Sequence, residues 1–505
     1  MDATAPSDPI TAYSHQQILR VVTGIMLCIF LASLDQTVII PAVPAMAADL
    51  NAFGHLSWIV TAYLLTSTAA TPIFGKLSDS YGRRALLLPA LALFIVASMG
   101  CGFAQTLPQL IAARGFQGLG GAGLFAMAQA AVADVVAPRE RGRYQGYMAS
   151  MWGISSIAGP IVGGWATDHL SWRWVFWINL PVGLVAIWLC NRALRTMPVV
   201  RRPARIDWLG AALLVGGVTA WLLMLSWGGV EYPWMSMPVL GLTVLGAALM
   251  LGLTWHEGRV ADPILPPRLF ANPVFFRGVL IAFFTSLGLF ASTFLLPLYF
   301  QLVRGEDAST SGLMVMPYLA ANVAGAFTGG QVARWLGRTR GIILIGLSLC
   351  AAGLAGTALA ASGGGVLLVM LCTVVIGAGT GATMPSVLMQ VQNAAERRDV
   401  GAATGSLLFL RSMGGAFGST LAGSLLTIRF NAGLAAAGLP PVDLGALRQG
   451  AAGLSGLAQA RAALASGFQL SFGVCAALLG VAVLIAAGMR DLQLRSASAP
   501  AEIGH

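Results

Sequence analysis

Residues 75–84 read GKLSDSYGRR, and residues 330–339 read GQVARWLGRT. In both stretches a short segment lies between two glycines, an arginine directly follows the second glycine, and the two copies are 255 positions apart. A second pair of similar stretches follows in the same order, PRERGRYQG at 138–146 and ERRDVGAATG at 396–405. Similar stretches that recur in one order predict two structurally similar halves.

The composition of the chain is that of an integral membrane protein. Of its 505 residues 57% are hydrophobic and 10% are charged, and the mean hydropathy is +0.78. This leaves too little polar surface to cover a water-soluble fold. Charged and Pro/Gly-rich breaks leave fourteen apolar segments of about 20 residues each, which is the length of a membrane-spanning helix. They lie at about 18–44, 56–75, 84–104, 108–134, 143–167, 172–193, 206–228, 236–256, 275–300, 309–333, 340–361, 365–389, 400–427 and 465–488.

The repeat and the segment count together predict the fold class. We expect an all-α integral membrane protein with 14 transmembrane helices, arranged as two six-helix halves with two further helices inserted between them. The predicted parts are a cytoplasmic tail at 1–17, an N-terminal half at 18–195, an accessory pair with its linker at 196–260, a C-terminal half at 261–490 with a periplasmic loop at about 428–464, and a cytoplasmic tail at 491–505.

The arginines predict the orientation. Of the 29 basic residues, 22 fall on the side of the membrane where both termini lie, five on the opposite side and two inside helices. The positive-inside rule therefore places both termini in the cytoplasm of a multi-pass protein of the plasma membrane, the inner membrane of the cell. The same asymmetry explains the net charge of +10 without a nucleic-acid partner. The first segment lacks a basic n-region and a cleavage site, so we expect it to be retained as a helix.

Several function classes are disfavoured. The six cysteines fall in apolar runs without a CxxC spacing, which is typical of packing residues, and the five histidines lie in loops or near helix ends. No metal site, catalytic triad or cofactor site is expected from them, which argues against a membrane enzyme. The sequence has no GxxxxGK[ST] stretch, so ATP is not expected to supply energy.

One acidic residue lies deep in an apolar segment. Asp35 occurs within LASLDQTVIIPAVP at 31–44, where a charge at the bilayer centre costs several kcal/mol. Arg114 lies about six residues into the fourth segment, and the depths of the two residues differ by only about one helical turn. We therefore expect Asp35 to face a wet cavity with Arg114 or Gln117 within reach, and to take up a proton when its partner moves away. The structural alternative is that Asp35 only ties helices together.

Five motifs resemble the major facilitator superfamily, and within it the fourteen-helix drug:proton antiporters. GKLSDSYGRR resembles the motif between the second and third helices of that superfamily. LDQTVIIPAVP (34–44), LIAARGFQGLGGAG (110–123), SIAGPIVGG (156–164) and SWRWVFWINLPVG (171–183) resemble motifs of the first, fourth, fifth and fifth-to-sixth helices. Ile40 and Pro41 depart from the Asn and Val that are usual in the first of these.

The resemblance implies a proton-driven exporter of hydrophobic or cationic small molecules, a multidrug-type efflux antiporter that works by alternating access. In GKLSDSYGRR, Gly75 and Gly82 permit a tight cytoplasmic turn, and Asp79 can pair with the loop arginines, among them Arg83, or with a neighbouring helix N-terminus and so latch one conformation. The alternative for this loop is that it only fixes topology. Arg334 stands in the second copy where the first has Asp79, so the same latch is not expected there.

The fifth predicted helix carries a row of small residues. Gly159 and Gly163 lie four positions apart and are followed by Gly164, while Pro160 should bend the helix. Such a row is typical of close helix packing. The resemblance adds that this contact governs leakage and closure in antiporters.

The predicted substrate cavity is lined by polar and aromatic side chains, although aromatic residues in membrane helices are also common as packing or interface anchors. The candidates are Gln36, Tyr63, Gln117, Phe294, Tyr299 and Arg411, with Trp58 and Met316 as further wall residues. For Arg411 the alternative is snorkelling or binding of helix carbonyls. The expected partners are a small-molecule substrate, protons and the lipid bilayer. Open alternatives are an exporter of one metabolite, a passive facilitator or a non-transporting sensor, acting either as a monomer or with a periplasmic adaptor and an outer-membrane channel.

Overall fold

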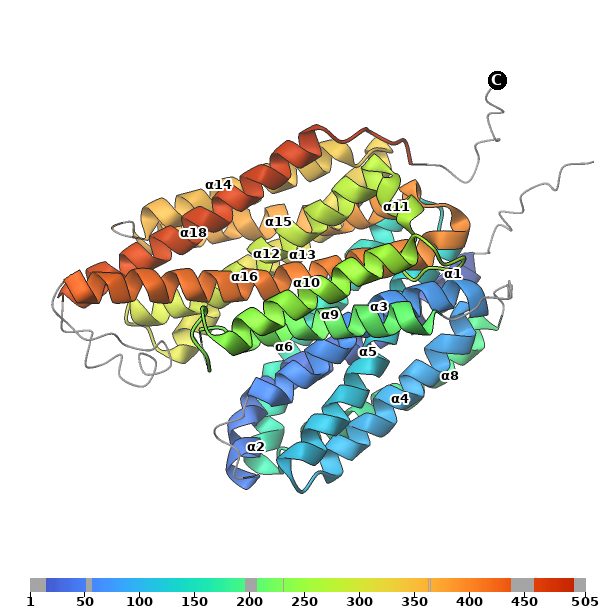
Figure 1. Cartoon of the computed structure of the whole chain (residues 1–505), viewed down its shortest axis with the longest axis horizontal. Helices are drawn as coiled ribbons and strands as arrows, with labels where there is room; N and C mark the ends of the chain where they lie inside the picture. Colours follow the sequence, from blue (N-terminus) through green and yellow to red (C-terminus); the bar gives the residue numbers. More distant parts are fainter. Residues whose placement is uncertain are drawn as a thin grey trace, which may run out of the picture.

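The computed structural model describes residues 15–50, 57–195, 207–229, 231–361, 363, 365–436 and 458–494, and every regular element in these ranges is a helix (Figure 1). The prediction of an all-helical fold is therefore confirmed for the described residues. Ten helical stretches among them are long and apolar enough to cross a membrane.

The N-terminal half ends before the first inserted helix. Its elements are α1 (His15–Val38), η1 (Ile40–Ala42), α2 (Val43–Asp49), α3 (Ser57–Tyr81), α4 (Arg83–Phe103), α5 (Leu107–Val135), α6 (Arg141–His169), α7 (Trp174–Trp177) and α8 (Asn179–Leu194). The inserted pair is α9 (Trp208–Trp227) and α10 (Met237–Glu257). The C-terminal half comprises α11 (Pro267–Ala271), α12 (Pro273–Leu302), α13 (Ala308–Leu336), α14 (Arg340–Ala360), α15 (Val366–Ala394), η3 (Arg397–Asp399), α16 (Val400–Ala436) and α18 (Ala458–Ala487).

The two copies of the repeated pattern take the same place in the two halves. Gly82 separates α3 from α4 with φ of 88°, and Gly337 ends α13 before α14 with φ of 65°. Positive φ angles favour glycine, which explains why each copy has one at this position. The repeat seen in the sequence is thus a repeat of a helix–turn–helix unit.

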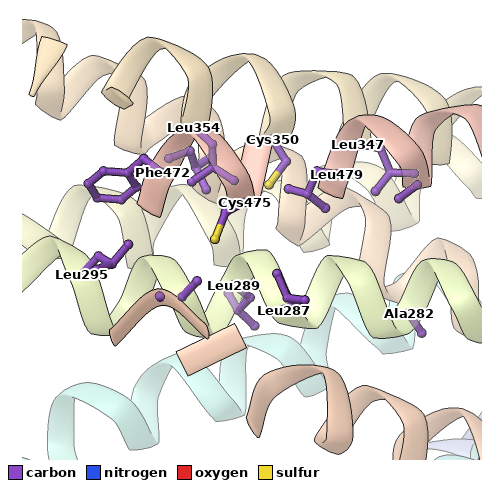
Figure 2. Packing of buried hydrophobic residues seen from close by; sticks show 14 of the residues in the cluster. Ala282, Leu287, Leu289, Leu295, Leu347, Cys350, Leu354, Phe472, Cys475 and Leu479 are labelled. Carbon is purple, nitrogen blue, oxygen red and sulfur yellow. The ribbon is translucent and has the colours of Figure 1, made fainter. Parts of the chain in front are cut away.

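Each half has its own apolar core. In the C-terminal half, Figure 2 shows Cys350 of α14 beside Leu479 of α18, and Cys475 of α18 pointing toward α12, with Phe472 on the same helix. The two cysteines are buried packing residues, as the sequence indicated. The N-terminal half is filled by a separate cluster drawn from α1, α3, α4, α5, α6 and α8. Two separate cores allow the halves to move as bodies relative to one another.

The halves touch mainly through two helix pairs, α3 with α16 and α6 with α13. Gly75 of α3 lies against Gly401 of α16, and Gly142 of α6 lies against Gly330 of α13, so closely that a Cβ at either position would meet a carbonyl oxygen of the opposite helix. We call the end of the bundle that holds these contacts the closed end. Figure 1 shows the N-terminal half (blue to cyan) and the C-terminal half (yellow to red) diverging from it toward the other end.

The inserted pair packs along the seam between α3 and α16. Leu214 and Val218 of α9 share one cluster with Ala69 of α3 and with Phe409 and Met413 of α16. Helix α9 therefore contacts both halves. The linker predicted before it, at 196–206, lies outside the described residues.

Both ends of the long predicted loop at about 428–464 differ from the prediction. Helix α16 continues to Ala436, and α18 begins at Ala458. Phe430 and Leu434 are buried in the C-terminal core, which extends the helix beyond the predicted end of the apolar segment at 427. Residues 437–457 lie outside the described residues, as do residues 1–14 of the predicted N-terminal tail and residues from 495 onward.

Candidate functional site

The carboxylate of Asp35 is buried among three helices of the N-terminal half. Its Oδ2 accepts a hydrogen bond of 2.7 Å from Nη1 of Arg114 on α5. Its Oδ1 accepts bonds of 2.7 Å from Nε2 of Gln117 and of 2.8 Å from Nδ2 of Asn179 at the start of α8. Asp35 and Arg114 are each only 1% exposed. The structure thus brings together the three polar residues that the sequence placed near one another.

Arg114 is held on every side. It also donates to Oε1 of Gln117 at 2.7 Å and to the carbonyl oxygen of Ile59 at 3.2 Å. Its guanidinium carbon lies 4.4 Å from the centre of the Tyr63 ring, a cation–π distance. The pair is therefore a neutral unit whose remaining polar atoms are largely satisfied, which is the condition under which a buried ion pair is tolerated.

The local sequence explains this arrangement. Arg114 and Gln117 are three residues apart on α5, so both side chains lie on the same helix face. Gly118 and Gly121 of the same motif lie against Tyr63, which reaches the guanidinium only because neither position carries a side chain. The glycines of LIAARGFQGLGGAG therefore bring α3 and its tyrosine against the charged pair.

Asn179 is a site residue that the sequence analysis missed. It is fully buried, and its Nδ2 also lies 3.0 Å from Oγ of Ser98, while its Oδ1 has no hydrogen-bond partner among the described residues. An amide can present either a donor or an acceptor. Asn179 can therefore donate to a charged Asp35 or, with its amide reversed, accept a hydrogen bond from a protonated one. The available signal was a single amide in the apolar run FWINLPVG.

The other predicted cavity residues fall in different places. Gln36 is half-buried next to Asp35, and Phe294 of α12 is 38% exposed. Tyr299 differs from the prediction, because it is fully buried between Phe300 and Phe468 in the C-terminal core and accepts a 3.0 Å bond from Nε of Arg304. Tyr299 is therefore a packing residue, which is the alternative role of aromatic residues in membrane helices.

The predicted latch residue Asp79 bridges the two halves at the closed end. Its two oxygens accept backbone hydrogen bonds of 2.8 Å from Gly401 and Ala402, at the N-terminus of α16. Its Oδ1 also lies 2.7 Å from Nη2 of Arg83, whose Nε is 2.8 Å from Oδ2 of Asp134. A carboxylate at a helix N-terminus satisfies free N–H groups and interacts favourably with the helix dipole.

The second copy of the pattern also bridges the halves, with the opposite charge. Nε of Arg334, at the end of α13, lies 2.8 Å from Oε2 of Glu140, the residue directly before α6. Nε of Arg139 donates to the carbonyl oxygen of Arg334 at 2.9 Å. The arginine at this position predicted that the Asp79 latch has no copy here, but the ion pair of Arg334 with Glu140 across the interface was not predicted.

The small residues of α6 pack against α1 just beyond Asp35. A Cβ at Gly159 would collide with Thr37, and one at Gly163 would meet the carbonyl oxygen of Val38. Oγ1 of Thr37 donates to the carbonyl oxygen of Ser155 at 2.8 Å. Pro160 lies inside α6 on its exposed side, and Gly164 faces open space. The contact therefore fixes α1 to α6 within one half, next to the charged pair.

The sequence matches the model of one protein family over most of its length. Residues 25–419 match the model of the Major Facilitator Superfamily. The chain belongs to this superfamily. It is similar to the uncharacterized MFS-type transporter Rv1877 of Mycobacterium tuberculosis, with 37% identity over 407 residues, which is 80% of this chain and 58% of that protein. The chain therefore spans less than two thirds of the length of this relative.

Two other relatives are named as a multidrug transporter and an efflux pump. The multidrug transporter protein MdtP of Bacillus subtilis is 35% identical over 81% of this chain and 75% of its own length. The MFS-type efflux pump LUC4 of a Fusarium species is 34% identical over 86% of this chain and 78% of its own length. Among solved structures, the proton:xylose symporter XylE aligns with a TM-score of 0.65 at 14% identity, covering 95% of this chain and 97% of its own. At that identity the likeness shows a shared fold. Together with the ten apolar helical stretches, the family makes this superfamily member a multi-pass membrane protein.

Proposed function

We propose that the protein is a proton-coupled antiporter that exports hydrophobic small molecules from the cell by alternating access. The observation that carries the proposal is the carboxylate of Asp35, which is buried in a membrane-spanning helix and held by three donors from two other helices. An ionisable group at such a depth is costly and marks ion or proton pathways. The name of the relative LUC4, an efflux pump, supports export as the direction of transport, and that of MdtP, a multidrug transporter, supports a small-molecule substrate.

Proton coupling follows from the neutrality of the charged pair. When Asp35 takes up a proton, Arg114 becomes a buried, uncompensated cation, which is strongly unfavourable unless the surrounding helices rearrange. The residues bonded to Asp35 come from α5 and α8, and the residues after it are fixed to α6. A change in its charge thus acts on the packing of the whole N-terminal half.

The proposed topology has fourteen crossings with both termini in the cytoplasm of the plasma membrane. Four helices supplement the ten apolar stretches, α3, α6, α13 and α16, with 25, 29, 29 and 37 residues. Each is long enough to span a bilayer. They are the helices through which the halves touch, which is consistent with their lower hydropathy. On this topology the closed end faces the cytoplasm, and the accessory pair lies outside the two six-helix halves.

Proteoliposomes test the proposal. A pH gradient should drive N-phenyl-1-naphthylamine across the membrane, with counter-movement of protons reported by trapped pyranine. Asp35→Asn keeps the shape of the side chain and should abolish both signals, whereas Asp49→Asn, at a half-exposed acid on α2, should preserve them. Pyranine signals from Asp35→Asn equal to those of the wild type would refute the role of Asp35. Exchange of the compound that is indifferent to the gradient would identify a passive facilitator instead.

A further inference from the structure

Arg411 is a deep cation that has no partner among the described residues. It lies on α16, eleven residues from Val400, which corresponds to roughly 16 Å along the helix axis. Its side chain is half-buried, and no hydrogen bond or ion pair to another described residue holds it. Every polar contact of Arg114, the other deep arginine, is by contrast accounted for within the protein. A partly desolvated guanidinium without an anion is an unusual and costly feature.

The contacts of the neighbouring residues show where Arg411 lies. One turn earlier, Leu407 and Leu408 are buried in the cluster that includes Ala126 of α5, across the interface between the halves. One turn later, Gly414 and Gly415 lie against Phe283 and Phe290 of α12. The opposite face of α16 carries Phe409 and Met413, which pack on α9. Arg411 therefore lies on the side of α16 that faces α12, opposite the side that packs on α9.

The part of the chain that the structure describes supplies no counter-charge for Arg411. None of the six long helices of the C-terminal half, α12, α13, α14, α15, α16 and α18, contains an aspartate or a glutamate. In the N-terminal half, Asp35 already accepts three hydrogen bonds and neutralises Arg114. Among the described residues the positive charge of Arg411 is thus uncompensated, and an aromatic side chain of α12, Phe290, lies against Gly415 one turn away and is 43% exposed.

We propose that Arg411 binds the anionic group of the transported compound, so that the preferred substrates are organic anions with an apolar, aromatic body. A guanidinium binds a carboxylate or sulfonate through charge-assisted, bidentate hydrogen bonds, and the phenylalanines of α12 suit a flat apolar body. The same charge repels a cation, which argues against the cationic substrates that the sequence had left open. This inference rests on the proposed transport function.

Two fluorescent probes with nearly the same skeleton test the inference. 8-Anilinonaphthalene-1-sulfonate carries a sulfonate that N-phenyl-1-naphthylamine lacks. Binding is measured by titration of the purified protein in nanodiscs, with empty nanodiscs subtracted. Arg411→Gln should weaken sulfonate binding at least about tenfold, as expected for a lost charge-assisted bond, and should change binding of the neutral probe less than twofold. Arg411→Lys should restore part of the affinity, and Arg429→Gln, at an exposed arginine of the same helix, should have no effect.

Several results would overturn the inference. These are failure of the wild type to bind the sulfonate probe, an equal loss for both probes in Arg411→Gln, and an equal loss of sulfonate affinity in Arg429→Gln. Transport of the probes in proteoliposomes separates this inference from the proposed function. Sulfonate binding that depends on Arg411 without any gradient-driven transport would uphold the inference and refute the antiporter. Gradient-driven transport together with sulfonate binding that does not depend on Arg411 would refute the inference and uphold the antiporter.

Discussion

Replacing Asp79 by asparagine should open the closed end. The wild-type carboxylate accepts two backbone hydrogen bonds from the N-terminus of α16 and pairs with Arg83, and the two side chains are only 5% and 7% exposed. Asparagine has nearly the same volume but only one acceptor oxygen, and its amide would point a donor at one of the two N–H groups. The variant therefore loses a charge-assisted hydrogen bond across the interface and the favourable interaction with the helix dipole.

These two contributions give the expected change in the free energy of the closed conformation relative to the open one. A charge-assisted hydrogen bond contributes about 1.5–3 kcal/mol, and a charge at a helix terminus about 0.3–1 kcal/mol. Their sum of about 2–4 kcal/mol changes the ratio of closed to open molecules by a factor of about 30 to nearly 1000. Arg83 also pairs with Asp134 of the same half, so the change should fall on the interface rather than on the stability of the N-terminal half.

Double electron–electron resonance measures this population directly. Spin labels at Tyr81→Cys and Arg398→Cys flank the closed end, in a Cys372→Ser background because the other five natural cysteines are buried. Asp79→Asn should move most of the distance distribution to longer values. Asp168→Asn, the same change at an exposed position of α6, should leave it unaltered. A distribution for Asp79→Asn that matches the wild type would refute the latch.

Three further predictions concern the same interface and the inserted pair. Arg334→Glu and Glu140→Arg should each impair efflux, the double variant should restore it, and an unrestored double variant would exclude a direct pairing. Because both side chains are more than a third exposed, each effect should be about 1 kcal/mol or less and should shrink at high salt. Gly142→Ala should prevent closure and stop efflux, since its Cβ would meet the carbonyl oxygen of Gly330, whereas Gly164→Ala has open space and should transport normally. Labelling of the closed end by a maleimide measures closure in both variants. Trp221→Ala should loosen the packing of α9 on α10 and lower the melting temperature, while transport per folded molecule stays near the wild-type value. A loss of transport at an unchanged melting temperature would show that α9 and α10 take part in the mechanism.

The sequence predicted the parts of the site that depend on depth along a helix. Asp35 and Arg114 could be paired because each is the deepest charge of its segment and their depths differ by about one turn. Asn179 was missed because its role depends on how α8 begins after the short helix α7, which hydropathy does not show. The bond between Arg334 and Glu140 was missed for a different reason, since it joins two halves whose relative placement no helix count provides.

The accessory helix α9 has a consequence for lateral access from the bilayer. The two seams between the halves are not equivalent, because α9 covers the one between α3 and α16, where Leu214 and Val218 contact residues of both helices. At the other seam, α6 and α13 meet each other directly, and Ile154 and Ile157 of α6 are about half exposed. A lipid tail or a membrane-dissolved compound that approaches sideways therefore meets an extra helix on one flank and the two seam helices themselves on the other. The insertion turns a nearly two-fold symmetric assembly into one with a shielded flank and an unshielded flank.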